Sequence, residues 1–197
     1  MSIKTEFLAS EDKSNNYVII IDEINRGQIS KIFGELITLI EKDKRAGESN
    51  EIKATLPSGQ VFTIPKNIYI IGTMNTADKS ISVIDSALRR RFVFIEKYPD
   101  TELLKKPIYK DILTRLNEAI YKELKSKDLL IGHSYFMCDI ELKDVFNNSV
   151  IPLLYEYFYD DEKKIEKVIT EAIKGTDAET ELEIDNNNSA RIRLKVK

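Results

Sequence analysis

The sequence predicts an α/β fold, in which a parallel sheet with helices over residues 1–98 is followed by a small α-helical domain. Two apolar runs rich in β-branched residues, at 17–21 and 68–71, are typical of strands buried on both faces of a parallel sheet. Between them, residues 29–41 carry apolar side chains at helical spacing. After Pro99 the apolar residues keep helical spacing alone, which predicts that helices follow.

The expected elements can be placed in order along the chain. In the first domain they are a strand at 17–21, a helix at 29–41, a hairpin over 51–64 with its turn at 57–60, a strand at 68–71, a short helix over 80–90 and a strand at 92–95. In the second domain, helices are expected at 108–125, 141–159 and 165–173. Pro152 predicts a kink or boundary, and Gly175 lies where a helix C-cap belongs.

The last residues have a pattern of their own, so the expected division is 1–98, 99–175 and 176–197. Acidic and apolar residues alternate over 181–185, and basic and apolar residues alternate over 191–195. Asparagines and a serine lie between them, which predicts a hairpin with acids opposite bases. A disordered charged tail is the alternative.

The composition excludes several classes of protein. With one cysteine, Cys138, and one histidine, His133, the chain has no internal disulfide framework, no cysteine zinc cage and no multi-histidine metal site. The net charge of −3 disfavours a protein that coats nucleic acid. No apolar run is long enough to span a membrane, and the first residues lack the apolar core of a signal peptide. A cytoplasmic protein is therefore expected.

Two adjacent carboxylates, Asp22 and Glu23, follow the first buried strand. This is the Walker B arrangement of nucleotide hydrolases, in which the strand fixes the first carboxylate at the ligand-binding edge of the sheet. Asp22 can hold, through water, the Mg²⁺ that bridges the phosphates, and Glu23 can polarise the attacking water as general base. The alternative is an acidic strand end that caps the following helix.

Asn75 follows the second buried strand, as does the sensor 1 residue of the ring-forming AAA+ NTPases. Such an amide can donate to the γ-phosphate or orient the attacking water, although an isolated asparagine after a strand is usually a turn residue. Residues 75–78 also match the Asn-x-x-Asp element by which Ras-like GTPases read guanine. In AAA+ geometry, however, this strand end faces the γ-phosphate.

Three consecutive arginines, Arg89, Arg90 and Arg91, lie between the expected short helix and the strand at 92–95. Arginine keeps its charge and forms bidentate contacts with phosphate oxygens. In an AAA+ ring, arginines at this place reach the nucleotide of the neighbouring subunit as fingers. A solvated basic patch and a DNA-facing patch are the alternatives.

Taken in order, these motifs closely resemble the McrB family, the AAA+ motor subunits of restriction systems that cleave DNA with modified cytosine. The matching segments are YVIIIDEINRG at 17–27, IFGEL at 32–36, MNTAD at 74–78 and LRRRF at 88–92. Two later segments, IGHSYF at 131–136 and IPLLYEY at 151–157, look like the helical lid of that family. The resemblance covers roughly residues 6–175.

The resemblance implies an NTPase that hydrolyses GTP or ATP with Mg²⁺ in a hexameric ring. It implies that Asp22 is the metal residue, Glu23 the base and Asn75 the sensor, with Arg90 and Arg91 as fingers. Asp78 would contact the nucleotide or orient the sensor loop or a finger, while His133 is either a lid sensor or a polar turn residue. The implied partners are identical subunits and a nuclease subunit of the McrC type. DNA is reached only indirectly, through an upstream reader domain.

The sequence departs from the family in its glycines, none of which opens a Gly-x-x-x-x-Gly-Lys-Ser/Thr phosphate loop. In the family this loop lies upstream of Walker B. We therefore expect a partial AAA+ sheet without its central strand, and no hydrolysis by the isolated chain. A complementing AAA+ subunit could supply the missing part, and a non-catalytic interaction module derived from such a motor is the alternative function.

Overall fold

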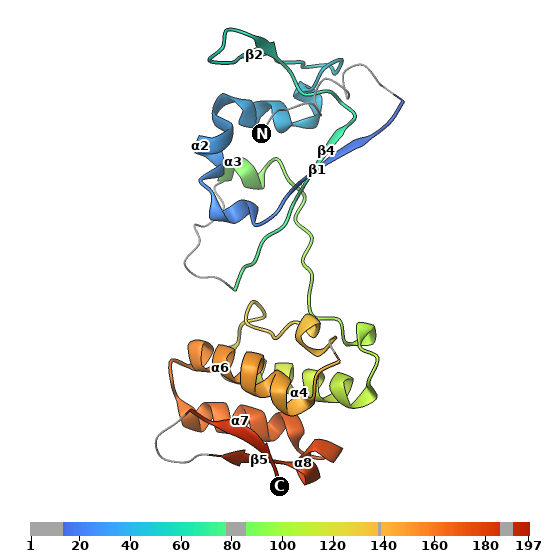
Figure 1. Cartoon of the computed structure of the whole chain (residues 1–197). Coiled ribbons are helices and arrows are strands. Elements are labelled where there is room, and N and C mark those ends of the chain that lie inside the picture. Colours follow the sequence, from blue (N-terminus) through green and yellow to red (C-terminus); the bar gives the residue numbers. More distant parts are fainter. Residues whose placement is uncertain (1–13, 78–85, 138, 186–190) are drawn as a thin grey trace. The chain divides into compact units, whose positions relative to one another are not determined.

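The computed structural model describes residues 14–77, 86–137, 139–185 and 191–197 (Figure 1). The chain divides into two compact units, Met1–Ile95 and Glu96–Lys197. In the first unit the elements are β1 (Tyr17–Ile21), η1 (Ile24–Arg26), α2 (Ile29–Phe33), η2 (Gly34–Ile40), η3 (Lys42–Lys44), β2 (Ala54–Thr55), β3 (Val61–Phe62), β4 (Ile68–Gly72) and α3 (Ser86–Arg89).

The sheet of the first unit is a parallel pair, β1 and β4, in which Tyr17 lies opposite Ile68 and Ile21 opposite Gly72. Parallel pairing brings the carboxyl ends of both strands to the same edge. Beneath one face lies an apolar core that includes Leu39, Ile40, Ile64 and Ile68. Both strands were predicted from the sequence, but the other face is exposed, contrary to the prediction of strands buried on both faces.

The helix expected at 29–41 is interrupted. Only α2, over Ile29–Phe33, is α-helical, and a 3₁₀ helix, η2, continues from Gly34 to Ile40. Gly34 has a φ of 50°, a left-handed conformation that ends a regular α-helix and that glycine adopts readily. The apolar stripe still reaches the core, because Leu39 and Ile40 of η2 are buried.

The first unit also contains a short hairpin and an arginine, Arg45, that joins two of its elements. Strands β2 and β3 pair antiparallel around the expected turn, with Gly59 at a φ of 82°. Arg45 donates hydrogen bonds to the carbonyl oxygens of Ile40, at 3.2 Å from Nε and 3.0 Å from Nη2, and of Ile68. Its guanidinium therefore joins the end of η2 to the start of β4.

The strand expected at residues 92–95 is not formed. These residues have no regular secondary structure and pair with no strand in the described part of the chain, and Val93 and Ile95 are 90% and 74% exposed. A strand needs a neighbour to satisfy its backbone groups, and the apolar pattern alone does not provide one. Of the short helix expected over 80–90, α3 is present, and residues 80–85 lie outside the described part.

The second unit is helical and has one large core. Its elements are η4 (Thr101–Leu103), α4 (Pro107–Leu124), η5 (His133–Phe136), α5 (Leu142–Val145), η6 (Phe146–Val150), α6 (Ile151–Phe158), α7 (Glu162–Ile173), α8 (Asp177–Glu181), β5 (Leu182–Asp185) and β6 (Arg193–Val196). Phe136 lies at its centre, edge-on to Tyr109 and Phe146 with ring centroids 6.0 and 6.4 Å apart. Within the described ranges, no helix has the length and apolar character to cross a membrane.

The segment expected as a helix over 141–159 contains a π turn, η6, between α5 and α6. Its characteristic bond runs from the Ile151 N–H to the Phe146 carbonyl. Pro152 is the second residue of α6, so its missing N–H falls where the π turn has already interrupted the regular bond pattern. The irregularity therefore lies next to Pro152, as predicted. It takes the form of a wider turn, and the helix continues after it.

Strands β5 and β6 form an antiparallel hairpin that belongs to the core of the second unit. Glu183 lies opposite Lys195, with 3.3 Å between Oε1 and Nζ, and Asp185 lies opposite Arg193. On the other face, Leu182 and Leu194 are buried in the helical core. The alternating charges therefore form the solvent face of a packed hairpin.

Candidate functional site

The carboxyl edge of the β1–β4 sheet carries the two acidic residues. Asp22 follows β1, and Thr73 follows β4 at the opposite register position. The Thr73 hydroxyl donates a hydrogen bond to the Asp22 carboxylate and accepts one, at 3.0 Å, from the backbone N–H of Glu23. A single side chain from β4 thus fixes both residues of the acidic pair. The role of Thr73 was not predicted from the sequence. It becomes visible only from the strand register, which places Thr73 opposite Asp22.

Glu23 has an unusual backbone. Its φ and ψ of 50° and 47° are left-handed, which is uncommon for a residue with a long side chain and costs about 1–2 kcal/mol. Its carboxylate lies 2.5 Å from Nε of Arg26, one 3₁₀ turn later. Strained conformations of this kind occur often at functional sites. The chain therefore leaves its strand in a sharp turn at Glu23, whose carboxylate pairs with Arg26.

A second link joins the acidic segment to the loop that follows β4. Asn25 is 8% exposed, and its Nδ2 donates to the carbonyl of Asn75 at 3.3 Å. The exposed Asn75 side chain accepts a hydrogen bond, at 3.1 Å, from the backbone N–H of Ala77. The structure thus brings the Asn75 loop to the acidic pair. Asp78, the other residue of this motif singled out above, lies outside the described residues.

The donors at this edge suit Mg²⁺ better than a metal that needs a full protein cage. Among the described residues, no group of three or more His, Cys, Asp or Glu side chains could hold a metal ion. Magnesium usually takes one or two carboxylates and completes its octahedron with water and substrate phosphates. An exposed carboxylate such as Asp22, oriented by a hydroxyl, fits that mode of binding.

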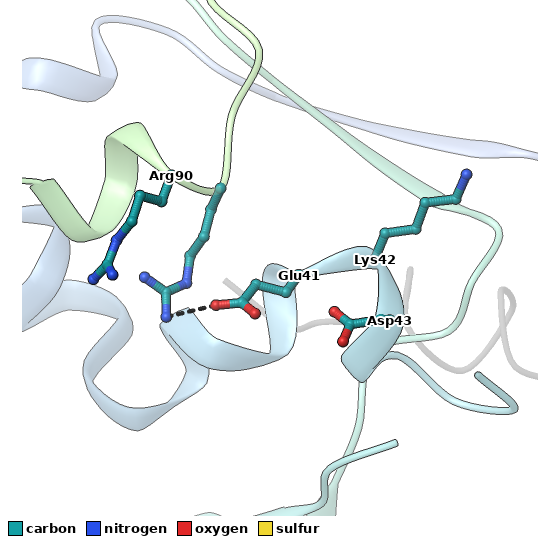
Figure 2. A pocket seen from close by; sticks show the side chains of 5 residues that line it. Glu41, Lys42, Asp43 and Arg90 are labelled. Carbon is teal, nitrogen blue, oxygen red and sulfur yellow. Dashed lines mark ion pairs between the residues drawn. The ribbon is translucent and has the colours of Figure 1, made fainter. Parts of the chain in front are cut away.

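The three arginines have different surroundings. Arg91 is the inner one, because its side chain is 11% exposed and its Nη2 lies 2.8 Å from Oε1 of Glu41. Arg89 lies over the ring of Phe94, at 5.4 Å from its centroid. Figure 2 shows the side chain of Arg90 beside the Arg91–Glu41 ion pair, in an open hollow of about 500 Å³ that Lys42 and Asp43 also line. Arg89 and Arg90 are both exposed, and Arg90 lies beside the anchored Arg91.

His133 is held inside the second unit. Its Nδ1 accepts a hydrogen bond from the backbone N–H of Asp100 at 3.0 Å. A neutral imidazole that accepts at Nδ1 carries its proton on Nε2. The ring is therefore fixed on one side by the chain that precedes α4. This hydrogen bond is what the second alternative, a hydrogen-bonded polar residue at a turn, requires.

The chain matches two protein families along its length. Residues 3–92 match the family described as "AAA domain (dynein-related subfamily)", and residues 109–166 match "McrB, alpha-helical lid domain". These matches agree with a small parallel sheet with helices that is followed by a helical lid. One match lies in each of the two units of the structure.

Two curated proteins are similar to the chain. The Escherichia coli (strain K12) protein named Type IV methyl-directed restriction enzyme EcoKMcrB subunit is 42% identical over 186 residues, which covers 81% of this chain and 40% of that protein. The Bacillus subtilis (strain 168) protein named Type II restriction enzyme BsuMI component YdiS is 28% identical over 177 residues, covering 75% and 50% respectively. The chain thus spans half or less of these relatives.

Proposed function

Because the chain belongs to the AAA+ proteins with a lid of the McrB type, we propose that it acts in the NTP-hydrolysing motor of a restriction system directed at modified DNA. The observation that carries the proposal is the joint fixing of Asp22 and Glu23 by Thr73 at the carboxyl edge of a parallel sheet. Ligands of open α/β sheets bind at this edge. The proposed substrate is GTP or ATP.

In this proposal each residue of the edge has one task. Asp22 would hold Mg²⁺ through water, and the ion would neutralise charge on the phosphates as the γ-phosphoryl group is transferred. Glu23 accepts a proton from the attacking water as general base. Arg26 holds the Glu23 carboxylate before substrate arrives, and Asn75 and Asp78 orient the γ-phosphate or the water. Thr73 keeps the two acidic residues at a fixed separation.

The arginines would act on a neighbouring subunit. Arg90 and Arg91 are the proposed fingers, and their surroundings suggest that Arg90 reaches the neighbour's phosphates while the Arg91–Glu41 ion pair fixes the segment. A finger requires a ring or another complementing AAA+ subunit, which is the proposed assembly. An McrC-like nuclease subunit and DNA read through another domain complete the proposed system.

A reconstituted assembly tests this function. The chain, combined with a polypeptide that supplies the phosphate-binding loop, should hydrolyse GTP or ATP in a phosphate-release assay. Glu23→Gln should abolish turnover and keep nucleotide bound, since glutamine retains the shape but cannot accept the proton. Glu118→Gln, an exposed glutamate on α4, is the matched control and should leave turnover unchanged. Equal turnover in Glu23→Gln and wild type would refute the assignment.

A non-catalytic assembly module is the second candidate, because none of the seven glycines opens a phosphate-binding loop. Such a module would join full-length motors through the surface around Arg90 without taking part in hydrolysis. In that case Glu23→Gln in this chain would leave the activity of the mixed assembly unchanged, whereas Arg90→Ala would weaken its formation.

A further inference from the structure

Strand β6 has an outer edge, on the side away from β5. In an antiparallel pair, successive residues direct their backbone groups alternately toward the partner strand and away from it. The Lys197 N–H donates to the Glu181 carbonyl at 3.0 Å, so Lys197 faces the β5 side. Val196, Leu194 and Ile192 therefore direct their N–H and carbonyl groups to the outer edge.

Two of these three residues are bonded by side chains of the helices. The Ile192 N–H donates to the Tyr155 hydroxyl at 2.8 Å, and both backbone groups of Leu194 bond to the Asn147 amide. Within the described ranges, the outward groups of Val196 have no such contact, and this residue is 62% exposed. The outer edge of β6 is therefore closed at Ile192 and Leu194 and open at Val196.

Val196 also lines a hollow of about 630 Å³ in the second unit, which we call the β6 hollow. Apolar side chains line it from two other elements, Ile108 from the first turn of α4 and Leu142 from the start of α5. Ile140 lines it as well and is 45% exposed. A volume of this size is typical of ligand sites. The open position at Val196 thus borders a space that an apolar side chain of a partner can enter.

The charges on the exposed face of β6 indicate which partner fits. On the inner edge, Glu183 lies opposite Lys195, and Glu181 bonds to Lys197, with an apolar residue of β5 opposite Val196. The chain's own strand therefore pairs an acid–apolar–acid sequence with these three residues. Because residues opposite one another share a face of the sheet, a strand at the outer edge would meet the same two lysines.

The β6 hollow itself is balanced in charge. The charged residues that line it are three lysines and three carboxylates: Lys106, Lys143, Lys197, Asp139, Glu141 and Glu181. Lys106 and Asp139 form an ion pair, with 3.2 Å between Nζ and Oδ1. The preference for acids therefore comes from the lysines on the face of β6.

We propose that Val196 and the β6 hollow bind an extended segment of a partner protein with the sequence pattern acid–apolar–acid. The apolar residue of the segment exchanges two backbone hydrogen bonds with Val196 and directs its side chain into the hollow. The acids on either side lie next to Lys195 and Lys197. In strand addition of this kind, backbone bonds give affinity and alternate side chains give specificity.

The structure also fixes the register of the segment. Because Asn147 already bonds both outward groups of Leu194, the segment cannot slide along β6 to pair there. Strand β6 lies outside the residues that match the lid family, and the site belongs to the second unit. Binding here is therefore independent of the nucleotide chemistry proposed for the first unit.

A second copy of the chain fits this edge less well. Two β6 strands that paired antiparallel about Val196 would set Lys195 of one copy opposite Lys197 of the other. Like charges directly opposite each other destabilise a pair of strands. A partner that carries acids at these two positions is therefore the occupant that the charges favour.

Peptide binding to the full chain tests the proposal. The probe is the fluorescein-labelled peptide Ser-Thr-Glu-Ile-Glu-Thr-Ser with blocked ends, and fluorescence anisotropy measures its binding. N-methylation of its isoleucine removes the N–H that reaches the Val196 carbonyl and should weaken binding about tenfold. The peptide Ser-Thr-Lys-Ile-Lys-Thr-Ser should also bind about tenfold more weakly, since it sets lysines beside Lys195 and Lys197.

Variants of the chain give the reciprocal measurement. Val196→Pro removes the outward N–H and keeps the bonds between β5 and β6, so it should weaken binding of the acidic peptide about tenfold. Val61→Pro is the matched control, because Val61 is 68% exposed and its N–H points away from β2, and it should bind like wild type. Lys197→Glu should weaken binding of the acidic peptide and strengthen binding of the basic one, each about threefold.

Several results would overturn the proposal. Equal binding of the methylated and unmodified peptides by the wild-type chain would do so, and this comparison needs no variant to fold. Equal binding of the acidic and basic peptides, or no binding at about 1 mM, would do the same. So would light scattering in which the chain alone forms a dimer that Val196→Pro dissociates, because a second copy would then occupy the edge.

Discussion

Asn147 and Leu194 form a reciprocal pair of hydrogen bonds across the second unit. Asn147 Nδ2 donates to the Leu194 carbonyl, and the Leu194 N–H donates to Asn147 Oδ1, both at 2.8 Å. Asn147 lies in the π turn η6, and Leu194 lies in strand β6. Among the described residues, β6 pairs only with β5, so this side-chain amide satisfies backbone groups at its other edge and attaches the hairpin to the helices.

Replacing this amide should destabilise the second unit. Asn147→Ala leaves a backbone N–H and a carbonyl of Leu194 without their partners, so the free energy of unfolding should fall by about 1–3 kcal/mol. Urea denaturation followed by circular dichroism measures the change. Asn148→Ala is the control, because Asn148 is exposed in the same turn and should cost less than about 0.5 kcal/mol. Equal losses in the two variants would contradict the role of Asn147.

The arginines at positions 90 and 91 should behave differently in stability measurements. Arg91→Ala removes a guanidinium that is mostly buried against Glu41 and should lower the free energy of unfolding by about 1 kcal/mol. Arg90→Ala should change it by less than about 0.5 kcal/mol, because Arg90 is exposed. A double-mutant cycle with Glu41→Gln isolates the pair, and a coupling energy near zero would refute the anchoring role of Arg91.

The left-handed backbone of Glu23 predicts that stability and catalysis oppose each other there. The free energy of unfolding of Glu23→Gly should be about 1 kcal/mol higher than that of Glu23→Ala, because only glycine adopts a φ of 50° without steric cost. Both variants lose the carboxylate and should be inactive in the reconstituted assembly. Thermal unfolding of the two variants measures the difference. If alanine were as stable as glycine, the strain at Glu23 would be disproved.

The Glu123–Lys167 pair predicts part of the pH dependence of the second unit. The hydrogen bond from Lys167, at 2.6 Å, lowers the pKa of Glu123 below its ordinary value, and the same contact raises the pKa of Lys167. A lowered carboxyl pKa stabilises the fold above the ordinary pKa of glutamate, and this contribution is lost as the pH falls through the folded value. Stability should therefore drop less steeply between about pH 5 and 3 in Glu123→Gln than in wild type.

Unfolding in urea across this pH range checks that prediction. Glu118→Gln, on the same helix, should keep the wild-type dependence. Parallel curves for wild type and Glu123→Gln would mean that the contact with Lys167 does not favour the ionised form of Glu123.

The sequence predicted those features that depend on local pattern and strand order. The apolar runs predicted β1 and β4, and the order of Asp22, Glu23 and Asn75 after them predicted which side chains gather at one edge. The contribution of Thr73 could not be predicted, because it depends on the register between strands far apart in sequence. The left-handed turn at Glu23 was also missed, since no glycine marks it.

The wrong predictions have a common cause. The apolar stripe over 29–41 and the run at 92–95 both indicate which side chains prefer to be buried. They do not indicate which groups form hydrogen bonds with the backbone of these segments. Gly34 ends the α-helix through its φ of 50°, and residues 92–95 have no paired strand in the described part of the chain. Periodicity predicts burial more reliably than it predicts hydrogen bonding.

The π turn at η6 sets the rotational phase of everything that follows it in its helix. A π turn holds one residue more than the α-helical turn that it replaces, and each residue of an α-helix rotates the next by about 100°. If the same residues formed a regular α-helix instead, every side chain after this turn would be rotated by about 100°, and the buried side chains Leu154 and Phe158 would turn out of the core. The wider turn thus absorbs one extra residue and keeps the buried face of α6 directed at the core.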